Sequence, residues 1–266
     1  MKKFIAAIVT ITISISLSEA SAQFKIGGKS IDAGKLIKAS SNVATAVKLS
    51  DDDVARLCRE SVEWMDANNP VADDTTEYCA RLKRLTANIK EVNGIPLNFK
   101  VYHVTDINAF ACADGSVRVF SSLMDIMDDD ELMGVIGHEI GHVAGGHSKA
   151  AMKTAYLSSA AVEAAGAAGG VAQQLSESAI ADLAVKLTNA QFSQKQESEA
   201  DEYGFQFAVA NGFDPYGPSN ALKKLSDMSG GAKASALQKM FSSHPDSQKR
   251  SARLKEMADE YTAKTR

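Results

Sequence analysis

Cysteine, excess positive charge and long apolar runs are all scarce in this sequence of 266 residues. The three cysteines include no Cys-x-x-Cys spacing, so a zinc site built from thiolates is not expected. Lysine and arginine number 29 against 33 acidic residues, a net charge of −4, which leaves no basic footprint for nucleic acid. No run beyond the N-terminus approaches the roughly 20 apolar residues of a membrane helix, so no transmembrane span is expected in the mature chain.

The N-terminus carries the three parts of an export signal. Lys2 and Lys3 precede the apolar run Phe4–Leu17, and the small-x-small cleavage site Ala20–Ala22 follows it. The run is too short for a bilayer span, so a cleaved secretory signal peptide over residues 1–22 is favoured over an anchor helix. No cysteine follows it as a site for a lipid anchor. The protein is therefore expected to be exported from the cytoplasm.

Composition and periodicity divide the rest of the chain. Residues 23–50, rich in Gly, Ser, Ala and Lys, are expected to be a weakly ordered lead-in, and 51–266 a single domain. Helical spacing marks Asp51–Ala67 and Thr75–Val92. Alternation between Phe99 and Phe120 predicts a small antiparallel sheet of about three strands, and the remainder is helical. The expected fold class is α+β and mainly helical.

An oxidising compartment is expected to pair two of the three cysteines. Cys58 and Cys79 lie at similar distances from the Asn68–Pro70 break between the two predicted helices. An antiparallel helix pair would bring them together, which favours a Cys58–Cys79 disulfide. A Cys58–Cys112 bridge is the alternative.

The chemistry-bearing motif is His138-Glu139-Ile140-Gly141-His142. On a helix the two histidines lie roughly 40° apart on one face, so both imidazoles can bind one zinc ion. Glu139 lies beside that face, where it can act as general base on a zinc-activated water. Asp128 and Glu131 form a capping-box pattern ahead of this helix, which supports a functional motif rather than a chance match.

The third ligand decides the class of zinc site. A metzincin would need histidine where this chain has Ser148, and His147 lies one residue too early. On a continuous helix His147 would point away, so it is predicted to be a structural or capping residue. Glu197 and Asp201 share one helix face, so one can bind zinc while the other orients a ligand histidine. Glu199 is expected to face elsewhere. The alternative for this acidic segment is a solvated helix face.

Five segments together resemble the HtpX and CAAX prenyl protease family of zinc metallopeptidases, and more closely its periplasmic LoiP-type members. These segments are NAFA (108–111), the stretch 117–124, HEIGHVAGGH (138–147), FSQKQESEAD (192–201) and SHP (243–245). The resemblance extends from about residue 50 to nearly the end of the chain. It implies a zincin-like fold and one Zn²⁺ per chain, bound by His138, His142 and Glu197, with Glu139 as base and Asp201 beside a ligand.

The same resemblance assigns further residues. His244 would approach the zinc, either filling its open position as a latency switch or assisting catalysis, and Arg250 matches an arginine that follows this His-Pro. Asn108, Ala109 and Phe110 resemble the edge strand that aligns the substrate. Two features of the family are missing here: the lipid-modified cysteine of LoiP-type members and the spanning helices of the integral-membrane branch.

The expected function is zinc-dependent endoproteolysis of unfolded or misassembled envelope proteins in periplasmic quality control. Outer-membrane proteins are among the expected substrates, and the envelope assembly machinery is an expected partner. A client-binding chaperone or assembly factor with latent proteolysis is the alternative. A purely structural zinc domain is a third interpretation, and Glu139 argues against it because a structural site needs no base beside the metal.

Overall fold

A computed structural model describes most of the chain. The described residues are 23–26, 29–32, 49–159, 175–229, 231 and 234–265. The signal peptide expected at residues 1–22 lies outside them, as does most of the expected lead-in. Within the lead-in, β1 (Gln23–Ile26) and β2 (Lys29–Asp32) pair as antiparallel strands in a unit of their own.

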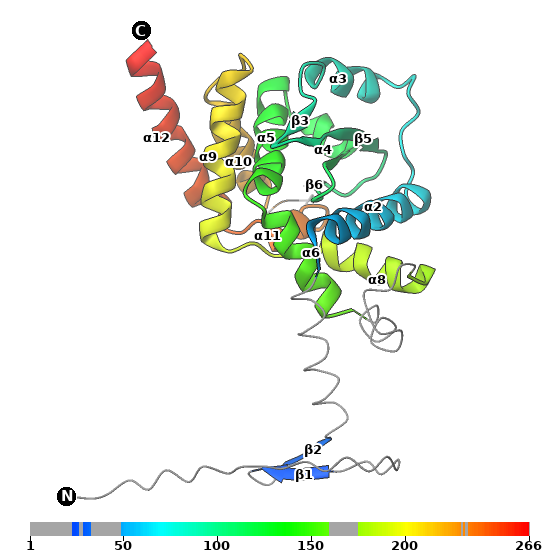
Figure 1. Cartoon of the computed structure of the whole chain (residues 1–266). Helices are drawn as coiled ribbons and strands as arrows, with labels where there is room; N and C mark the ends of the chain where they lie inside the picture. The colour runs from blue at the N-terminus through cyan, green and yellow to red at the C-terminus, as the bar shows by residue number, and fades with distance from the viewer. Residues whose placement is uncertain are drawn as a thin grey trace, which may run out of the picture. The chain divides into compact units, whose positions relative to one another are not determined.

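Helices dominate the second unit, which begins at residue 42 (Figure 1). They are α2 (Asp51–Asn68), α3 (Glu77–Leu85), α4 (Ser121–Ile126), α5 (Asp129–Ala144), α6 (His147–Leu157), α8 (Glu177–Thr188), α9 (Gln194–Ala210), α10 (Gly217–Met228), α11 (Gln238–Ser243) and α12 (Ser247–Thr265). Within the described ranges, no helix combines the length and the apolar character needed to cross a bilayer. The mainly helical α+β prediction is confirmed.

The predicted sheet is present, but one strand pair runs differently from expectation. It consists of β5 (Asn98–Tyr102), β6 (Ala109–Ala111) and β7 (Ser116–Phe120) in the order β5-β7-β6. A tight turn with Gly115 at φ +87° makes β6 and β7 an antiparallel hairpin. The connection after β5 leads to the far edge, so β7 returns between the other two strands and runs parallel to β5. The sheet is therefore mixed rather than wholly antiparallel.

The helix predicted over Thr75–Val92 is shorter than its apolar spacing suggested. It ends at Leu85, and a two-stranded hairpin follows, β3 (Glu91–Val92) and β4 (Ile95–Pro96). Asn93 and Gly94 form its turn with φ of 51° and 77°. Asn-Gly favours this left-handed turn geometry, and the turn chemistry here outweighs the helical spacing.

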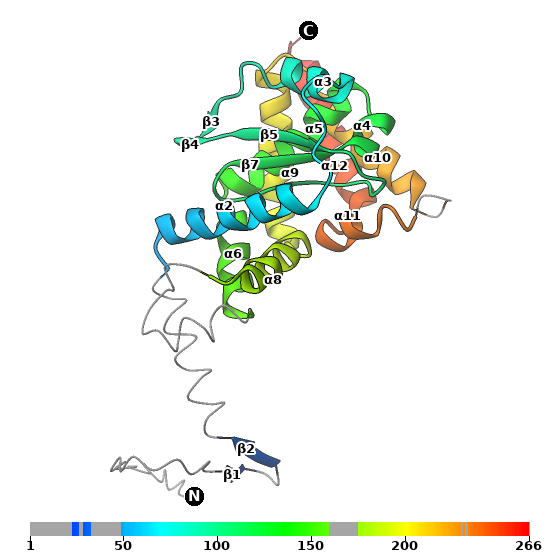
Figure 2. The same ribbon diagram turned by 90° about the vertical axis from the view of Figure 1, so that its right-hand side faces the viewer.

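The sheet separates two hydrophobic cores, because successive side chains of a strand point to opposite faces. Val101, Val117 and Val119 join the core that buries α5. Tyr102, Phe110 and Phe120 contact one another on the other face, in the core that contains α2, α6 and α8. Figure 2 shows α3 and α2 on opposite sides of the sheet.

A buried ion cluster joins α2 to the sheet. Arg118 on β7, only 2% exposed, donates from Nε to Asp66 Oδ1 at 2.8 Å and from Nη2 to Oδ2 at 2.9 Å. The Tyr102 hydroxyl and the Lys100 ammonium also donate to this carboxylate. Burial would raise the pKa of Asp66, but the hydrogen bonds from Arg118, Lys100 and Tyr102 outweigh it and hold the pKa below its ordinary value.

The structure does not contain the expected Cys58–Cys79 bridge, and all three thiols are free. The antiparallel helix pair behind that prediction does not form, because α3 packs on β5 whereas α2 packs on α6 and α8. Cys79 consequently lies in the first core, where its thiol donates to the Ala72 carbonyl, and Cys58 lies in the second. Cys58 neighbours Cys112, and its contact and burial together raise the pKa of the Cys112 thiol. Cys58 and Cys112 are the alternative pair that the sequence leaves open.

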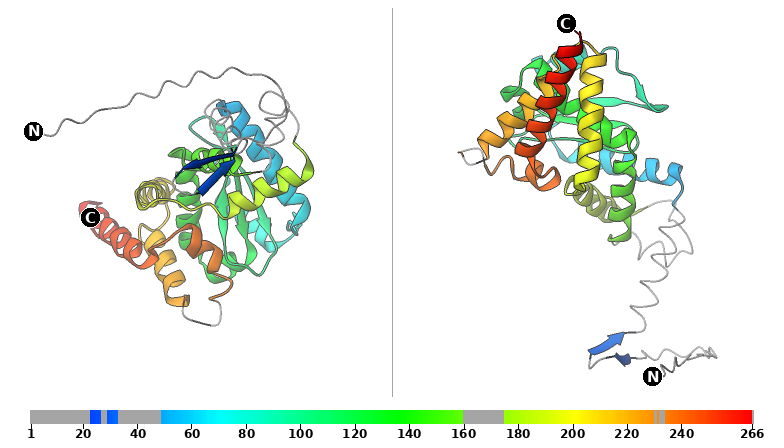
Figure 3. Two further views of the ribbon diagram at one scale, coloured as in Figure 1. Left: turned by 90° about the horizontal axis from the view of Figure 1, so that it is seen from below. Right: turned by 90° about the vertical axis from the view of Figure 1, so that its left-hand side faces the viewer.

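Helices α5 and α9 approach each other closely through small residues. A Cβ added at Gly204 of α9 would lie 2.8 Å from the His138 nitrogen, and one at Gly141 of α5 would lie 2.9 Å from the Ala200 carbonyl oxygen. Only glycine permits this separation. Figure 3 shows α9 flanked by α12 and α5, so residues of all three helices can meet at one place.

Candidate metal centre

Helix α5 buries one face and presents the chemistry on the other. Its capping box is formed: the Glu131 amide donates to Asp128 Oδ1 at 2.9 Å, and the Asp128 amide donates to Glu131 Oε2 at 3.0 Å. Leu132, Ile136, Ile140 and Val143 pack into the first core. The opposite face directs His138 and His142 toward α9. His138, Glu139, His142 and these four apolar side chains are buried.

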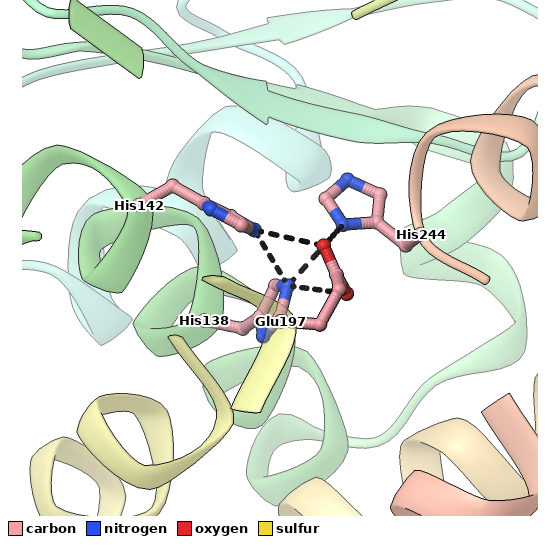
Figure 4. A group of neighbouring side chains, drawn as sticks. All are labelled: His138, His142, Glu197 and His244. Carbon is pink, nitrogen blue, oxygen red and sulfur yellow. Dashed lines mark hydrogen bonds and ion pairs between the residues drawn. The ribbon is translucent and has the colours of Figure 1, made fainter. Parts of the chain in front are cut away.

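Three side chains converge between α5 and α9 (Figure 4). His138 Nε2 lies 3.1 Å from His142 Nε2, and His142 Nε2 lies 3.3 Å from Glu197 Oε1. His138 Nε2 lies 3.6 Å from Glu197 Oε2. Ligand atoms at about 2.0–2.1 Å from a tetrahedral zinc are separated by roughly 3.3 Å. The observed separations therefore suit such an ion.

The proton positions on the two imidazoles also suit a cation. His138 Nδ1 lies 3.0 Å from Asp201 Oδ1. Because a carboxylate can only accept, the proton of the His138 ring lies on Nδ1. His142 Nδ1 likewise faces another partner, His147. Burial lowers the pKa of His142 well below its ordinary value, which keeps that ring neutral. Two lone pairs then face each other across 3.1 Å, an arrangement that a bound cation relieves.

Asp201 and Arg250 lie behind His138. Arg250, from α12, donates to Asp201 from Nε at 2.8 Å and from Nη2 at 2.6 Å, and it also contacts Glu197. Burial would raise the pKa of Asp201, but hydrogen bonds from Arg250 and His138 lower it to about 2. The Asp201 carboxylate is therefore ionised and fixes the orientation of the His138 ring.

Glu197 is a buried carboxylate that remains ionised. Burial disfavours its charge, yet its contacts with the imidazoles of His142 and His244 hold its pKa well below the ordinary range. An ionised oxygen facing two neutral imidazole nitrogens completes a donor set that zinc prefers.

His244 lies at the fourth side of the cluster. Its Nδ1 is 3.0 Å from Glu197 Oε1 and 3.3 Å from His138 Nε2. Its other nitrogen, Nε2, is 3.6 Å from Glu139 Oε1. Ligand atoms of His138, His142, Glu197 and His244 all lie within 4.8 Å of one another. The His244 ring therefore fills the space between the ligand cluster and Glu139.

Cavities open on both sides of Glu139 and His244. One is bounded by Asn108–Cys112, so it runs along β6, the edge strand of the sheet. Asn108 is buried in this wall, and its side-chain oxygen has no hydrogen-bond partner among the described residues. The other cavity is mainly apolar and is lined by Val135, Leu222, Leu225 and Met240, among others.

Sequence reasoning missed three residues that surround His142. His147 Nδ1 lies 3.0 Å from His142 Nδ1, Glu199 contacts His147, and Phe192 stacks on the His142 ring with centroids 3.8 Å apart. The prediction that His147 points away assumed a continuous helix. Gly145-Gly146 was the available signal, because α5 ends there and the chain turns back.

Comparisons with known proteins identify the family of this chain. Residues 77–258 match Peptidase family M48. The chain is 40% identical over 227 residues to the Metalloprotease YcaL of Escherichia coli (strain K12), covering 85% of this chain and 88% of that protein. It is 38% identical over 231 residues to the Metalloprotease LoiP of the same organism, covering 86% and 90%. A Beta-barrel assembly-enhancing protease of Yersinia pestis is 35% identical over 179 residues, covering 63% of this chain and 36% of that protein. The chain belongs to peptidase family M48 and is a metallopeptidase.

Proposed function

We propose that this chain is a zinc-dependent endopeptidase of the periplasm that acts on unfolded or misassembled envelope proteins. His138, His142 and Glu197 are its zinc ligands, and Glu139 is its general base. The observation that carries this proposal is the convergence of three ligand side chains, whose nitrogen and oxygen atoms lie 3.1–3.6 Å apart, beside the buried carboxyl group of Glu139.

The catalytic step follows from the position of Glu139. A bound zinc would polarise the scissile carbonyl and lower the pKa of a water molecule toward about 7. Burial raises the pKa of Glu139, against the lowering effect of His244 and His138, and a raised pKa brings the group closer to the operating pH. Glu139 takes the proton of the attacking water and returns it to the leaving amine.

His244 makes the described arrangement a resting state. Its ring occupies the space between the ligand cluster and Glu139, where water and the scissile carbonyl would have to enter. We propose that His244 moves out when substrate binds, so that proteolysis is latent until then. This observation also favours the second candidate function, a client-binding chaperone or assembly factor in which proteolysis is secondary.

The edge strand β6 is the proposed substrate platform. An extended peptide can add to such an edge through backbone hydrogen bonds, a mode that reads backbone more than side chains. Asn108, Ala109 and Phe110 border a cavity that Glu139 also lines. Unfolded proteins expose such extended segments.

The location rests on the N-terminal pattern and on the relatives. The name of the Yersinia relative refers to β-barrel assembly, which supports outer-membrane proteins as substrates and the envelope assembly machinery as a partner.

In the oxidising periplasm we propose a Cys58–Cys112 disulfide: both thiols lose their protons and one electron each to a disulfide oxidant, which is reduced to two thiols. Mass spectrometry of the exported protein would identify the linked peptides. A Cys58–Cys79 linkage would contradict this assignment.

The test of the function compares three variants on unfolded casein. Glu139→Gln should keep zinc and lower cleavage by about 10²–10⁴-fold, the usual contribution of a general base. His244→Ala should cleave faster than the wild type. The matched control is His103→Ala, at an exposed histidine next to Tyr78, which should leave the rate unchanged. Normal cleavage by Glu139→Gln would refute the peptidase mechanism. Zinc binding with no cleavage by either the wild type or His244→Ala would favour the client-binding alternative.

A further inference from the structure

The His142 ring is restrained at both ends and on one face. Its Nε2 points to His138 and Glu197, and its Nδ1 lies 3.0 Å from His147 Nδ1. The second nitrogen of His147, Nε2, lies 3.1 Å from Glu199 Oε2. Phe192 stacks on the ring at an interplanar angle of 22°. A continuous chain of contacts therefore leads from the candidate metal ligand to the Glu199 carboxylate.

Hydrogen-bond chemistry gives this chain one direction. A neutral imidazole that binds metal through Nε2 carries its proton on Nδ1. His142 Nδ1 then donates to His147 Nδ1, which must accept. The His147 proton consequently lies on Nε2, and this nitrogen donates to Glu199, which as a carboxylate can only accept. Each donor is matched to one acceptor.

We propose that His147 and Glu199 are positioning residues that hold His142 in the tautomer and rotation required for metal binding. The proposal rests on the proposed function of His142 as a zinc ligand. His147 does not bind the metal itself, because its Nδ1 accepts from His142 and its Nε2 is directed to Glu199.

The local sequence provides the space for this arrangement. Helix α5 ends at Ala144, and Gly146 adopts φ +71°, which turns the chain so that His147 begins α6 and faces back to His142. A Cβ added at Gly145 would lie 2.7 Å from His147 Nε2. The absence of a side chain at Gly145 therefore leaves room for the His147 ring.

The two ligand histidines are supported unequally. His138 contacts the buried Asp201 directly, and that side chain is 3% exposed. His142 reaches a carboxylate only through His147, and the Glu199 side chain is 49% exposed and also lies 3.5 Å from Lys195 Nζ. Solvent weakens the interaction at Glu199. Loss of His147 should consequently matter more than loss of Glu199.

The test measures zinc affinity of the full chain by competition with a chromophoric chelator. His147→Phe keeps a ring but removes the acceptor, and affinity should fall about 10–100-fold, as for other groups that orient a ligand. His147→Asn can place its amide oxygen where Nδ1 lies and should recover most of the affinity. Glu199→Gln should lose affinity measurably, but by less than about 10-fold. Its matched control is Glu202→Gln, on the same helix but paired with Arg253, which should bind zinc like the wild type.

Three outcomes would overturn the proposal: wild-type affinity in His147→Phe, an equal loss in His147→Phe and His147→Asn, or an equal loss in Glu199→Gln and its Glu202→Gln control. If His147→Phe does not fold, Glu199→Gln decides, because the Glu199 side chain is half exposed and its replacement should not prevent folding. A loss of zinc affinity in Glu199→Gln supports the positioning role, and wild-type affinity contradicts it. Failure of the proposed function is distinguishable, because the wild type itself would then bind no zinc or cleave nothing.

Discussion

Two buried arginine–aspartate pairs lie in different parts of the molecule and differ mainly in what surrounds them. Arg118 and Asp66 join the sheet to α2, and Arg250 and Asp201 join α12 to α9. Both pairs are bidentate, with N–O distances of 2.8 and 2.9 Å in the first and 2.8 and 2.6 Å in the second. The chemistry of the pair itself is therefore the same.

The additional partners separate a structural pair from one that serves the site. Asp66 also accepts from Tyr102 and Lys100, so its hydrogen bonds connect only a helix and a sheet. Asp201 also accepts from His138, and Arg250 also contacts Glu197, both of them candidate metal ligands. A buried ion pair by itself is thus weak evidence of function. Its contact with a ligand in a cleft is the informative feature.

The largest expected effect is on stability at the structural pair. Asp66→Asn leaves the buried Arg118 charge without its counter-ion, which should lower the free energy of unfolding by about 3–5 kcal/mol. Urea denaturation of the metal-free protein measures this change. The control is Glu63→Gln, an exposed position on the same helix. Zinc affinity of the folded Asp66→Asn protein should equal that of the wild type, and a reduced affinity would break the distinction between the two pairs.

The corresponding change at the site should act on metal binding. Asp201→Asn weakens the acceptor that fixes the His138 ring, and zinc affinity should fall about 10–100-fold. Chelator competition measures the affinity, with Glu202→Gln as the control on the same helix. Unchanged affinity would mean that Arg250 and Asp201 form a merely structural pair.

Acid should weaken both pairs. The pKa of each aspartate is lowered in the folded state, that of Asp201 to about 2. Each therefore contributes stability above its unfolded pKa of about 3.9, and loses it as pH falls through the folded value. For Asp201 this range is about pH 4 to 2. Unfolding free energy of the metal-free protein should fall with acid, less steeply in Asp66→Asn. Parallel curves for the variant and the wild type would contradict the account of Asp66.

The smallest effect is expected at the rim of the structural cluster. The Lys100 side chain is 42% exposed, so its contact with Asp66 is screened by solvent. Lys100→Met should lower the free energy of unfolding by about 0–1 kcal/mol, measured by urea denaturation. A loss as large as that of Asp66→Asn would show that Lys100, and not Arg118, is the principal counter-ion.

The parts of the site that were predictable from the sequence are those set by local spacing. His138 and His142, one helical turn apart, share a face on any helix, and so do Glu197 and Asp201. The capping box at Asp128 is equally local. These spacings, with the family resemblance, named residues that the structure brings together.

The parts that were not predictable depend on contacts distant in sequence or on a change of chain direction. The parallel pairing of β5 with β7 follows from where the connection after β5 leads. The positions of the cysteines follow from which core each helix joins. His147 was placed wrongly because its direction depends on Gly146, whose left-handed backbone ends one helix and begins another.

The central claim is that α5 and α9 together form one zinc site, and metal content tests it most directly. Zinc per chain should be measured after dialysis for the wild type, Glu197→Ala and the control Glu202→Gln, with circular dichroism to confirm folding. We expect one zinc per chain in the wild type and the control, and almost none in folded Glu197→Ala. A wild type without zinc, or a Glu197→Ala protein that retains it, would contradict the account.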